Sequence, residues 1–161
     1  MASGTTSTLR PGHWLRQGWR LPLREKALLG SAWALLTLAA LAIRVLPTRV
    51  YCRLLGRSMG AVACQPVLTE SQLSKARLIR NAIRRAGLVA PLRKDCLPQA
   101  IAAALLCRSL GVPSAVHLGT ARDDGDGLLA HAWLAAGPIA VTGGHAWERY
   151  HVVACFTQGP R

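Results

Sequence analysis

The spacing of apolar residues changes near residue 114, and the two sides of this point predict different secondary structure. Upstream, apolar residues form one long run over residues 27–46 and then recur at helical spacing over residues 70–87 and 96–110. Downstream, short alternating runs are separated by turn sequences rich in Gly, Asp and Pro, which is typical of antiparallel hairpins. The pattern predicts an α+β fold in which N-terminal helices precede a small antiparallel sheet.

The apolar run over residues 27–46 has two interpretations. Its length of about 20 residues is enough to cross a bilayer, and the basic residues just upstream would keep the N-terminus in the cytoplasm. Its many Ala, Gly and Ser residues and its single charge, Arg44, are equally typical of a helix buried against a sheet. We favour the buried helix, so the expected location is cytoplasmic, with membrane contact through residues 27–46 as the alternative.

Local signals place the boundaries of the next two helices. Pro47 ends the long run, and the basic segment after it is expected to be a short helix that stops near Gly56 or Gly60. Thr69 followed by Gln72 resembles a capping box at the start of a longer amphipathic helix. The short helix therefore has a predicted end, and the longer helix has a predicted start.

Two further boundaries frame a candidate reactive residue. Gly87 is expected to end the amphipathic helix, and Asp95 is suited to cap the helix that follows, which Gly111 closes. Cys96 therefore lies at a helix N-terminus. Together these elements predict a mobile basic tail over residues 1–24, an N-terminal helical segment over residues 25–66 and one core domain over residues 67–161.

Basic residues outnumber acidic ones by 20 to 7, which gives a formal net charge of +13. Such a charge suits nucleic acid, anionic lipid or an acidic peptide and does not choose among them. No helix-turn-helix, zinc finger or aromatic-rich RNA-binding sheet can be recognised, so nucleic acid is not an expected partner. The outer face of the amphipathic helix carries a basic stripe, Arg77, Arg80 and Arg84, which either faces water or docks an acidic partner.

The five cysteines show no Cys-x-x-Cys pair and no zinc-type Cys/His spacing, so no metal or other cofactor is expected. Their odd number and the lack of a recognisable signal peptide favour a reducing cytosol. Cys96 is the strongest nucleophile candidate, because the free N–H groups at a helix N-terminus favour a thiolate. The adjacent Asp95 opposes this unless capping hydrogen bonds hold its charge. The alternative is that Cys96 is a small buried residue without a chemical role.

His131 is the candidate base. It lies in an alternating run, LLAHAWLA, between Ala neighbours that leave room for a reacting partner. If the following hairpin turn is centred on Ala136 and Gly137, Thr142 lies opposite His131 and can offer its ring a neutral hydrogen bond. A structural histidine is the alternative interpretation, and three other histidines rank lower: His117, His145 and His151.

Several stretches recur in a recognisable order: KDCLPQA around Cys96, LGVP before the first strand, AHAW around His131, VTGG at residues 141–144 and then Arg149-Tyr150. This order resembles that of the lasso-peptide maturation proteases, over residues 25–156 and most specifically between Cys96 and Trp133. The resemblance implies a reduced transglutaminase-type, papain-like fold. In such a fold a helix bearing the cysteine packs on an antiparallel sheet bearing the histidine.

The resemblance also implies an activity. Proteases of this family remove the leader from a ribosomal peptide precursor, and a separate ATP-using cyclase then joins the new amino terminus to an acidic side chain. Cys96 matches the family's nucleophile and His131 its base. The usual third member, an aspartate shortly after the histidine, is missing from the matching stretch AVTGG, which leaves a dyad or a triad completed by Thr142 or another group. Gln99, one turn after Cys96, is a candidate oxyanion donor beside the Cys96 backbone N–H.

Partners and alternatives follow from the same comparison. The family commonly places leader recognition on a small winged-helix-like domain, and the segment up to residue 66 lacks the strand pattern of such a domain. We therefore expect a separate leader-recognition protein, with the basic stripe as its dock. Two other functions stay open: acyl transfer to an amine by the same cysteine and histidine, as in transglutaminases, and non-enzymatic binding of membrane or nucleic acid through charge.

Overall fold

The computed structural model describes residues 22–90, 95–123, 127–144 and 148–159. Within these residues the chain forms four helices and one five-stranded sheet, so the predicted α+β class is confirmed. The elements, in chain order, are α2 (Leu23–Val45), α3 (Thr48–Leu55), β1 (Arg57–Gly60), α4 (Glu70–Val89), α5 (Cys96–Ser109), β2 (Ser114–Arg122), β3 (Leu128–Ala136), β4 (Ile139–Thr142) and β5 (His151–Gln158).

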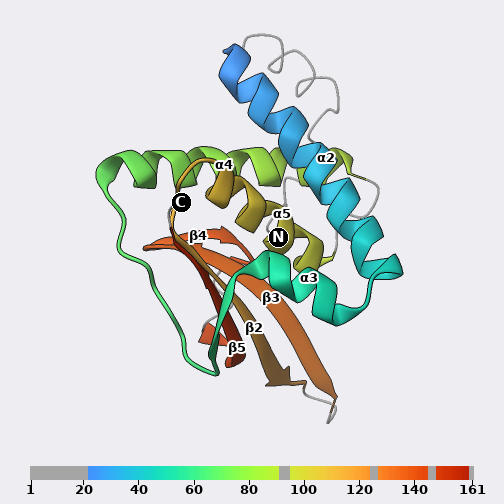
Figure 1. The fold of residues 1–161 in the computed structure, drawn as a ribbon. Helices are drawn as coiled ribbons and strands as arrows, with labels where there is room; N and C mark the ends of the chain where they lie inside the picture. The colour runs from blue at the N-terminus through green and yellow to red at the C-terminus, as the bar shows by residue number, and fades with distance from the viewer. Residues whose placement is uncertain (1–21, 91–94, 124–126, 145–147, 160–161) are drawn as a thin grey trace, which may run out of the picture.

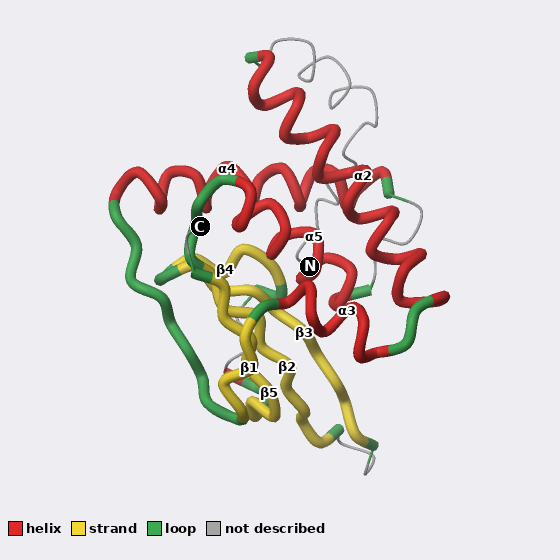
Figure 2. The backbone as a smooth tube through the Cα atoms, in the orientation of Figure 1, coloured by secondary structure: helices red, strands yellow, loops and turns green. Residues whose placement is uncertain are grey.

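The sheet is antiparallel throughout, with the strand order β1-β5-β2-β3-β4. Figure 1 shows α4 and α5 on one side of the sheet with α2 crossing over them, and Figure 2 shows the strands gathered beneath this helical layer. β4 is short and pairs with β3 only from Leu134 to Ala136. In the described part of the chain, the edge of β3 between Leu128 and Trp133 therefore has no strand beside it on the β4 side.

The helix α5 forms the centre of the core. Its sequence is apolar on every side, which is the pattern of a helix that neighbours cover all round. Many of its buried residues are alanines, and these small side chains let α2, α4 and β3 pack closely against it. The start of α5, where Cys96 lies, is consequently anchored by a buried helix.

The predicted capping box of α4 is confirmed. The Thr69 hydroxyl accepts a hydrogen bond from the Gln72 backbone N–H at 3.3 Å, and the Gln72 side chain accepts one from the Thr69 N–H at 3.0 Å. Gln72 also donates to the Gly111 carbonyl at 3.1 Å, and Lys75 donates to the Leu110 carbonyl at 3.2 Å, so α4 satisfies carbonyl groups at the end of α5. The helix runs two residues past Gly87, which is therefore not its cap.

The segment between α2 and α4 holds one element that the sequence pattern did not predict. The short helix α3 ends at Leu55, so Gly56 and not Gly60 marks its stop. The next residues, Arg57–Gly60, form the edge strand β1, which pairs with β5. The Gln158 side chain of β5 also hydrogen-bonds the Leu54 carbonyl, which ties α3 to the sheet.

One side of α2 is buried and the other is exposed. Ala32, Leu36 and Ala39 are buried in the same core as α4 and α5, whereas Leu38 and Leu41 are exposed. By length and composition α2 is able to cross a membrane, which is weak evidence of membrane association. The predicted boundary at residue 66 stays a prediction, although residues on both sides of it share this core. Most of the predicted tail, residues 1–21, lies outside the described residues.

Candidate active site

The two faces of the sheet carry different side chains. Ala132 and Leu134 of β3 belong to the core that also contains α4 and α5. Because side chains alternate along a strand, His131 and Trp133 lie on the opposite face. The register confirms this, since Trp133 pairs with His117 of β2 and their rings stack at 5.3 Å. The candidate base therefore lies on the sheet face that is turned away from the body of α5.

Cys96 lies on the helical side. It is the first residue of α5, half-buried, and packs against the main core. Together with Ala40, Ile43 and Arg44 of α2 it lines a cavity of about 370 Å³. Asp95 occupies the N-cap position as predicted, but its side chain makes no capping hydrogen bond. The nucleophile candidate thus has the helix N-terminus that the sequence predicted and an adjacent hollow.

His131 is half-buried among two aromatic rings and a backbone carbonyl. Its ring lies 5.1 Å from the Tyr150 ring at a tilt of 31°, and 6.2 Å from the Trp133 ring at 18°. Its Nε2 atom lies 3.4 Å from the carbonyl oxygen of Gly143. These contacts hold one side of the imidazole, with Nε2 facing the carbonyl.

A comparison with protein-family models gives one match, which covers residues 39–155 and is described as transglutaminase-like superfamily. This range contains Cys96, His131 and most of the described elements. The chain belongs to the transglutaminase-like superfamily. No curated protein and no solved structure matches it.

Within this transglutaminase-like core, the pairing of Cys96 with His131 remains a prediction. Among the described residues, no hydrogen bond joins the Cys96 thiol to the His131 ring. α5 packs on β3, so the helix that starts at Cys96 and the strand that carries His131 are in contact.

The predicted register of Thr142 is wrong. The hairpin pairs Ala136 with Ile139, so the turn is formed by Gly137 and Pro138. A register shift between Leu134 and Ala135 then places Thr142 opposite Leu134. The buried Thr142 hydroxyl accepts a hydrogen bond from the Leu134 N–H at 3.0 Å. Thr142 was proposed as the third member because it was expected to lie opposite His131, and the observed register does not support that placement. The group that reaches His131 is the backbone of the next residue, which a search for polar side chains does not find.

Trp133 organises the face that carries His131. It is almost fully buried, and Gly119 makes room for it, because a Cβ at this glycine would lie 2.7 Å from two ring atoms of Trp133. His117, whose ring stacks with that of Trp133, accepts a hydrogen bond through Nε2 from the Cys64 N–H at 3.2 Å. Burial lowers the pKa of His117, so this ring is neutral at physiological pH.

Two other thiols are unsuited to nucleophilic attack. Burial raises the pKa of Cys107 to about 12, although the nearby Ser114 side chain acts in the opposite direction. Burial and the neighbouring Cys64 raise the pKa of Cys155 to about 11. Both are protonated at neutral pH, and a protonated thiol is a poor nucleophile. Within the described residues, no group of three or more His, Cys, Asp or Glu side chains is placed to hold a metal ion.

The roles of the remaining predicted residues stay predictions. Gln99 is half-buried in the first turn of α5, one turn from Cys96. The three residues of the basic stripe, Arg77, Arg80 and Arg84, are exposed on α4. His151 is exposed at the start of β5, and His145 lies outside the described residues.

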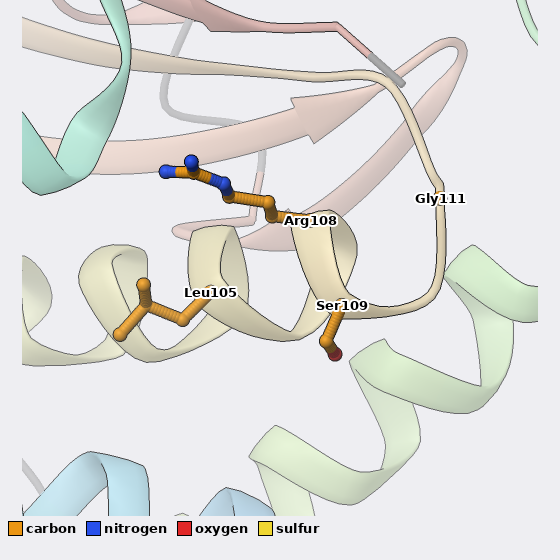
Figure 3. A pocket seen from close by; sticks show the side chains of 4 residues that line it. All are labelled: Leu105, Arg108, Ser109 and Gly111. Carbon is orange, nitrogen blue, oxygen red and sulfur yellow. The ribbon is translucent and has the colours of Figure 1, made fainter. Parts of the chain in front are cut away.

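A larger hollow, of about 470 Å³, lies at the other end of α5. Leu105, Arg108, Ser109 and Gly111 line it, and the Arg108 and Ser109 side chains extend to different sides of the helix (Figure 3). A helix of 14 residues is about 20 Å long, so this hollow is remote from Cys96. It contains none of the predicted catalytic residues.

Proposed function

We propose that this transglutaminase-like protein is a cysteine peptidase that removes the leader from a ribosomal lasso-peptide precursor. Cys96 is the nucleophile and His131 the base. The observation that carries the proposal is the half-buried Cys96 at the N-terminus of a core helix, beside a hollow, in a chain of this superfamily. The high pKa values of Cys107 and Cys155 further favour Cys96 as the reactive thiol.

The reaction proceeds through a thioester. The Cys96 thiolate attacks the scissile carbonyl carbon, the carbon–nitrogen bond breaks, and His131 gives its proton to the leaving amine. Water then attacks the thioester while His131 accepts a proton, which releases the leader with a free carboxylate and restores the thiol. The Cys96 backbone N–H and the Gln99 amide are the proposed donors to the oxyanion.

This chemistry requires the Cys96 thiol and the His131 ring to come within hydrogen-bond reach of each other. The two side chains start on different sides of β3, so a bound substrate must bring the start of α5 and the His131 ring closer together. Catalytic hydrogen bonds are often long in a free enzyme and shorten only when substrate is bound.

The proposed partners are the precursor leader, a separate leader-recognition protein and a lasso cyclase that consumes the cleaved product. The exposed stripe of Arg77, Arg80 and Arg84 is the proposed dock, because an acidic or polar partner would be attracted to it. The proposed location is the cytoplasm, with the exposed apolar side of α2 as the site of any membrane contact.

Acyl transfer to an amine is the second candidate, because membership of the transglutaminase-like superfamily is compatible with it. Its first step is the same thioester, and an amine replaces water in the second. The product separates the two functions, since hydrolysis yields a free leader and transfer yields a crosslinked or amine-bearing product.

The test is cleavage of the precursor, in the presence of the leader-recognition protein, followed by mass spectrometry. We expect wild type to release the leader, and Cys96→Ala and His131→Ala to lose more than about a thousandfold in rate. Cys52→Ala, which changes a half-buried thiol in α3, is the matched control and should retain full activity. A crosslinked product would support acyl transfer, and unimpaired cleavage by Cys96→Ala would refute the proposed nucleophile.

A further inference from the structure

In the stretch AVTGG, which lacks the aspartate that the family resemblance implies, the Gly143 backbone carbonyl faces the His131 ring. We infer that the Gly143 carbonyl is the group that orients His131, and that it replaces the side chain of an acidic third member. This inference rests on the proposed function, because an orienting group matters only if His131 is the base. Gly143 is a positioning residue, since it acts on the reaction through the imidazole.

The contact determines which nitrogen of His131 is the base. A carbonyl oxygen only accepts hydrogen bonds, so the Nε2 atom facing it at 3.4 Å carries the proton. A neutral imidazole has one protonated nitrogen, which leaves the Nδ1 lone pair free to accept a proton from the thiol. The separation exceeds the range of roughly 2.7–3.2 Å typical of strong N–H···O bonds, and we expect it to shorten when substrate binds.

Only glycine fits at this position. Gly143 has a φ of +78°, in the left-handed region that other residues rarely adopt. A Cβ here would collide with the Trp133 Cβ and lie 3.1 Å from His131 Nε2. The glycine therefore lets the backbone approach close enough for its carbonyl to meet the imidazole.

The surrounding rings stabilise this arrangement. Tyr150 and Trp133 lie against the His131 ring and restrict its rotation. Three separated parts of the chain, β3, the turn after β4 and the residue before β5, thus hold one imidazole.

A carbonyl differs from a carboxylate in one respect that matters for catalysis. Both select the Nε2–H form of the ring, but the carbonyl carries no full negative charge and stabilises the imidazolium less. The thiolate–imidazolium pair is therefore favoured less than in an enzyme with an aspartate at this place. The expected cost is a slower step, with the direction of proton transfer unchanged.

Gly143→Ala and Gly144→Ala form a matched pair for the test. Both glycines are in the left-handed region, at φ values of 78° and 61°, so alanine strains the backbone in the same way at either position. A Cβ at Gly144 meets nothing within 4 Å, whereas one at Gly143 meets His131 and Trp133. Only the first substitution should disturb the carbonyl that faces Nε2.

The decisive measurement is the NMR spectrum of the protein with ¹⁵N-labelled histidine, in which His131 is assigned by the signal lost in His131→Gln. We expect a proton on Nε2 that exchanges slowly with water in wild type and Gly144→Ala, and fast exchange in Gly143→Ala. A wild-type ring protonated on Nδ1, or an unchanged signal in Gly143→Ala, would overturn the inference. Should Gly143→Ala fail to fold, the wild-type spectrum still decides which nitrogen is protonated.

Kinetics supply the second readout. We expect Gly143→Ala to lower kcat about ten- to a hundredfold with little change in KM, and Gly144→Ala to retain the wild-type kcat. Equal cleavage by wild type and Gly143→Ala would reject Gly143 as a positioning residue while leaving the peptidase proposal intact. Absence of cleavage by wild type would instead reject the peptidase, and the NMR result would still report on the contact.

Discussion

The two faces of β3 differ in the side chains they carry and in the roles we assign to them. The face toward α5 carries small and aliphatic side chains, such as Ala132 and Leu134, that fill the space beneath a buried helix. The other face carries His131 and Trp133, stacked with further rings. Alternate residues of one strand therefore pack into the core, and the residues between them include the proposed catalytic histidine. The proposed active site must combine the thiol of one side with the imidazole of the other.

Among the variants that test this difference between the faces, Trp133→Ala is expected to have the largest effect on stability. The change leaves a cavity on the His131 face, and we expect it to lower the free energy of unfolding by about 3–5 kcal/mol. Trp33→Ala on α2 is the control, because this tryptophan is 45% exposed and should cost much less. Urea titration followed by circular dichroism measures both. Equal losses for the two variants would show that the ring stack adds no stability.

Alkaline unfolding tests the buried thiols on each side of the sheet. In the folded protein the pKa values of Cys107 and Cys155 are raised to about 12 and about 11, from an ordinary value of 9.0. The unfolded chain therefore binds fewer protons above pH 9, so stability is fully present below that pH and declines as the pH rises toward the folded values. Urea midpoints measured from pH 8 to 11 should fall for wild type, and less steeply for Cys107→Ala. A flat profile would contradict the burial of these thiols.

Gly119→Ala tests the close packing of the ring face. The new Cβ would press on the Trp133 ring and on the His151 carbonyl, and we expect a loss of about 1–3 kcal/mol in unfolding free energy. Gly87→Ala is the matched control on the helical side, since nothing lies within 4 Å of that position in α4. Alanine should there stabilise the helix by about 0.5–1 kcal/mol. Thermal melting would show shifts of opposite sign.

The smallest expected effect is on partner binding by the exposed face of α4. Reversing the charges of Arg80 and Arg84 should weaken binding of the leader or its delivery protein several-fold, and raised salt should reduce the difference. Reversal of Arg49 and Arg53 on α3 changes the net charge equally and serves as control. Isothermal titration in low and high salt distinguishes a specific dock from general attraction. The same binding loss in both variants would reject the α4 dock.

Elements with a local cause were predicted well. The capping box of Thr69 and Gln72 and the start of α5 after Asp95 depend on residues within one turn of each other. β1 was missed because its four residues are all exposed and show no alternation, and it becomes a strand only because β5 offers an edge. The β3–β4 register was wrong because the turn is centred one residue later than expected, on Gly137 and Pro138, and because an irregularity between Leu134 and Ala135 shifts the pairing by one more residue.

By itself the sequence determined the α+β class, the helix that begins at Cys96 and the alternating strand that carries His131, because each depends on residues close together in the chain. Only the tertiary structure decided which face of β3 His131 occupies and that the Gly143 carbonyl meets its Nε2 atom. These features depend on strand register and on contacts between distant segments. Every residue has a backbone carbonyl, so the sequence does not indicate which carbonyl contacts the imidazole.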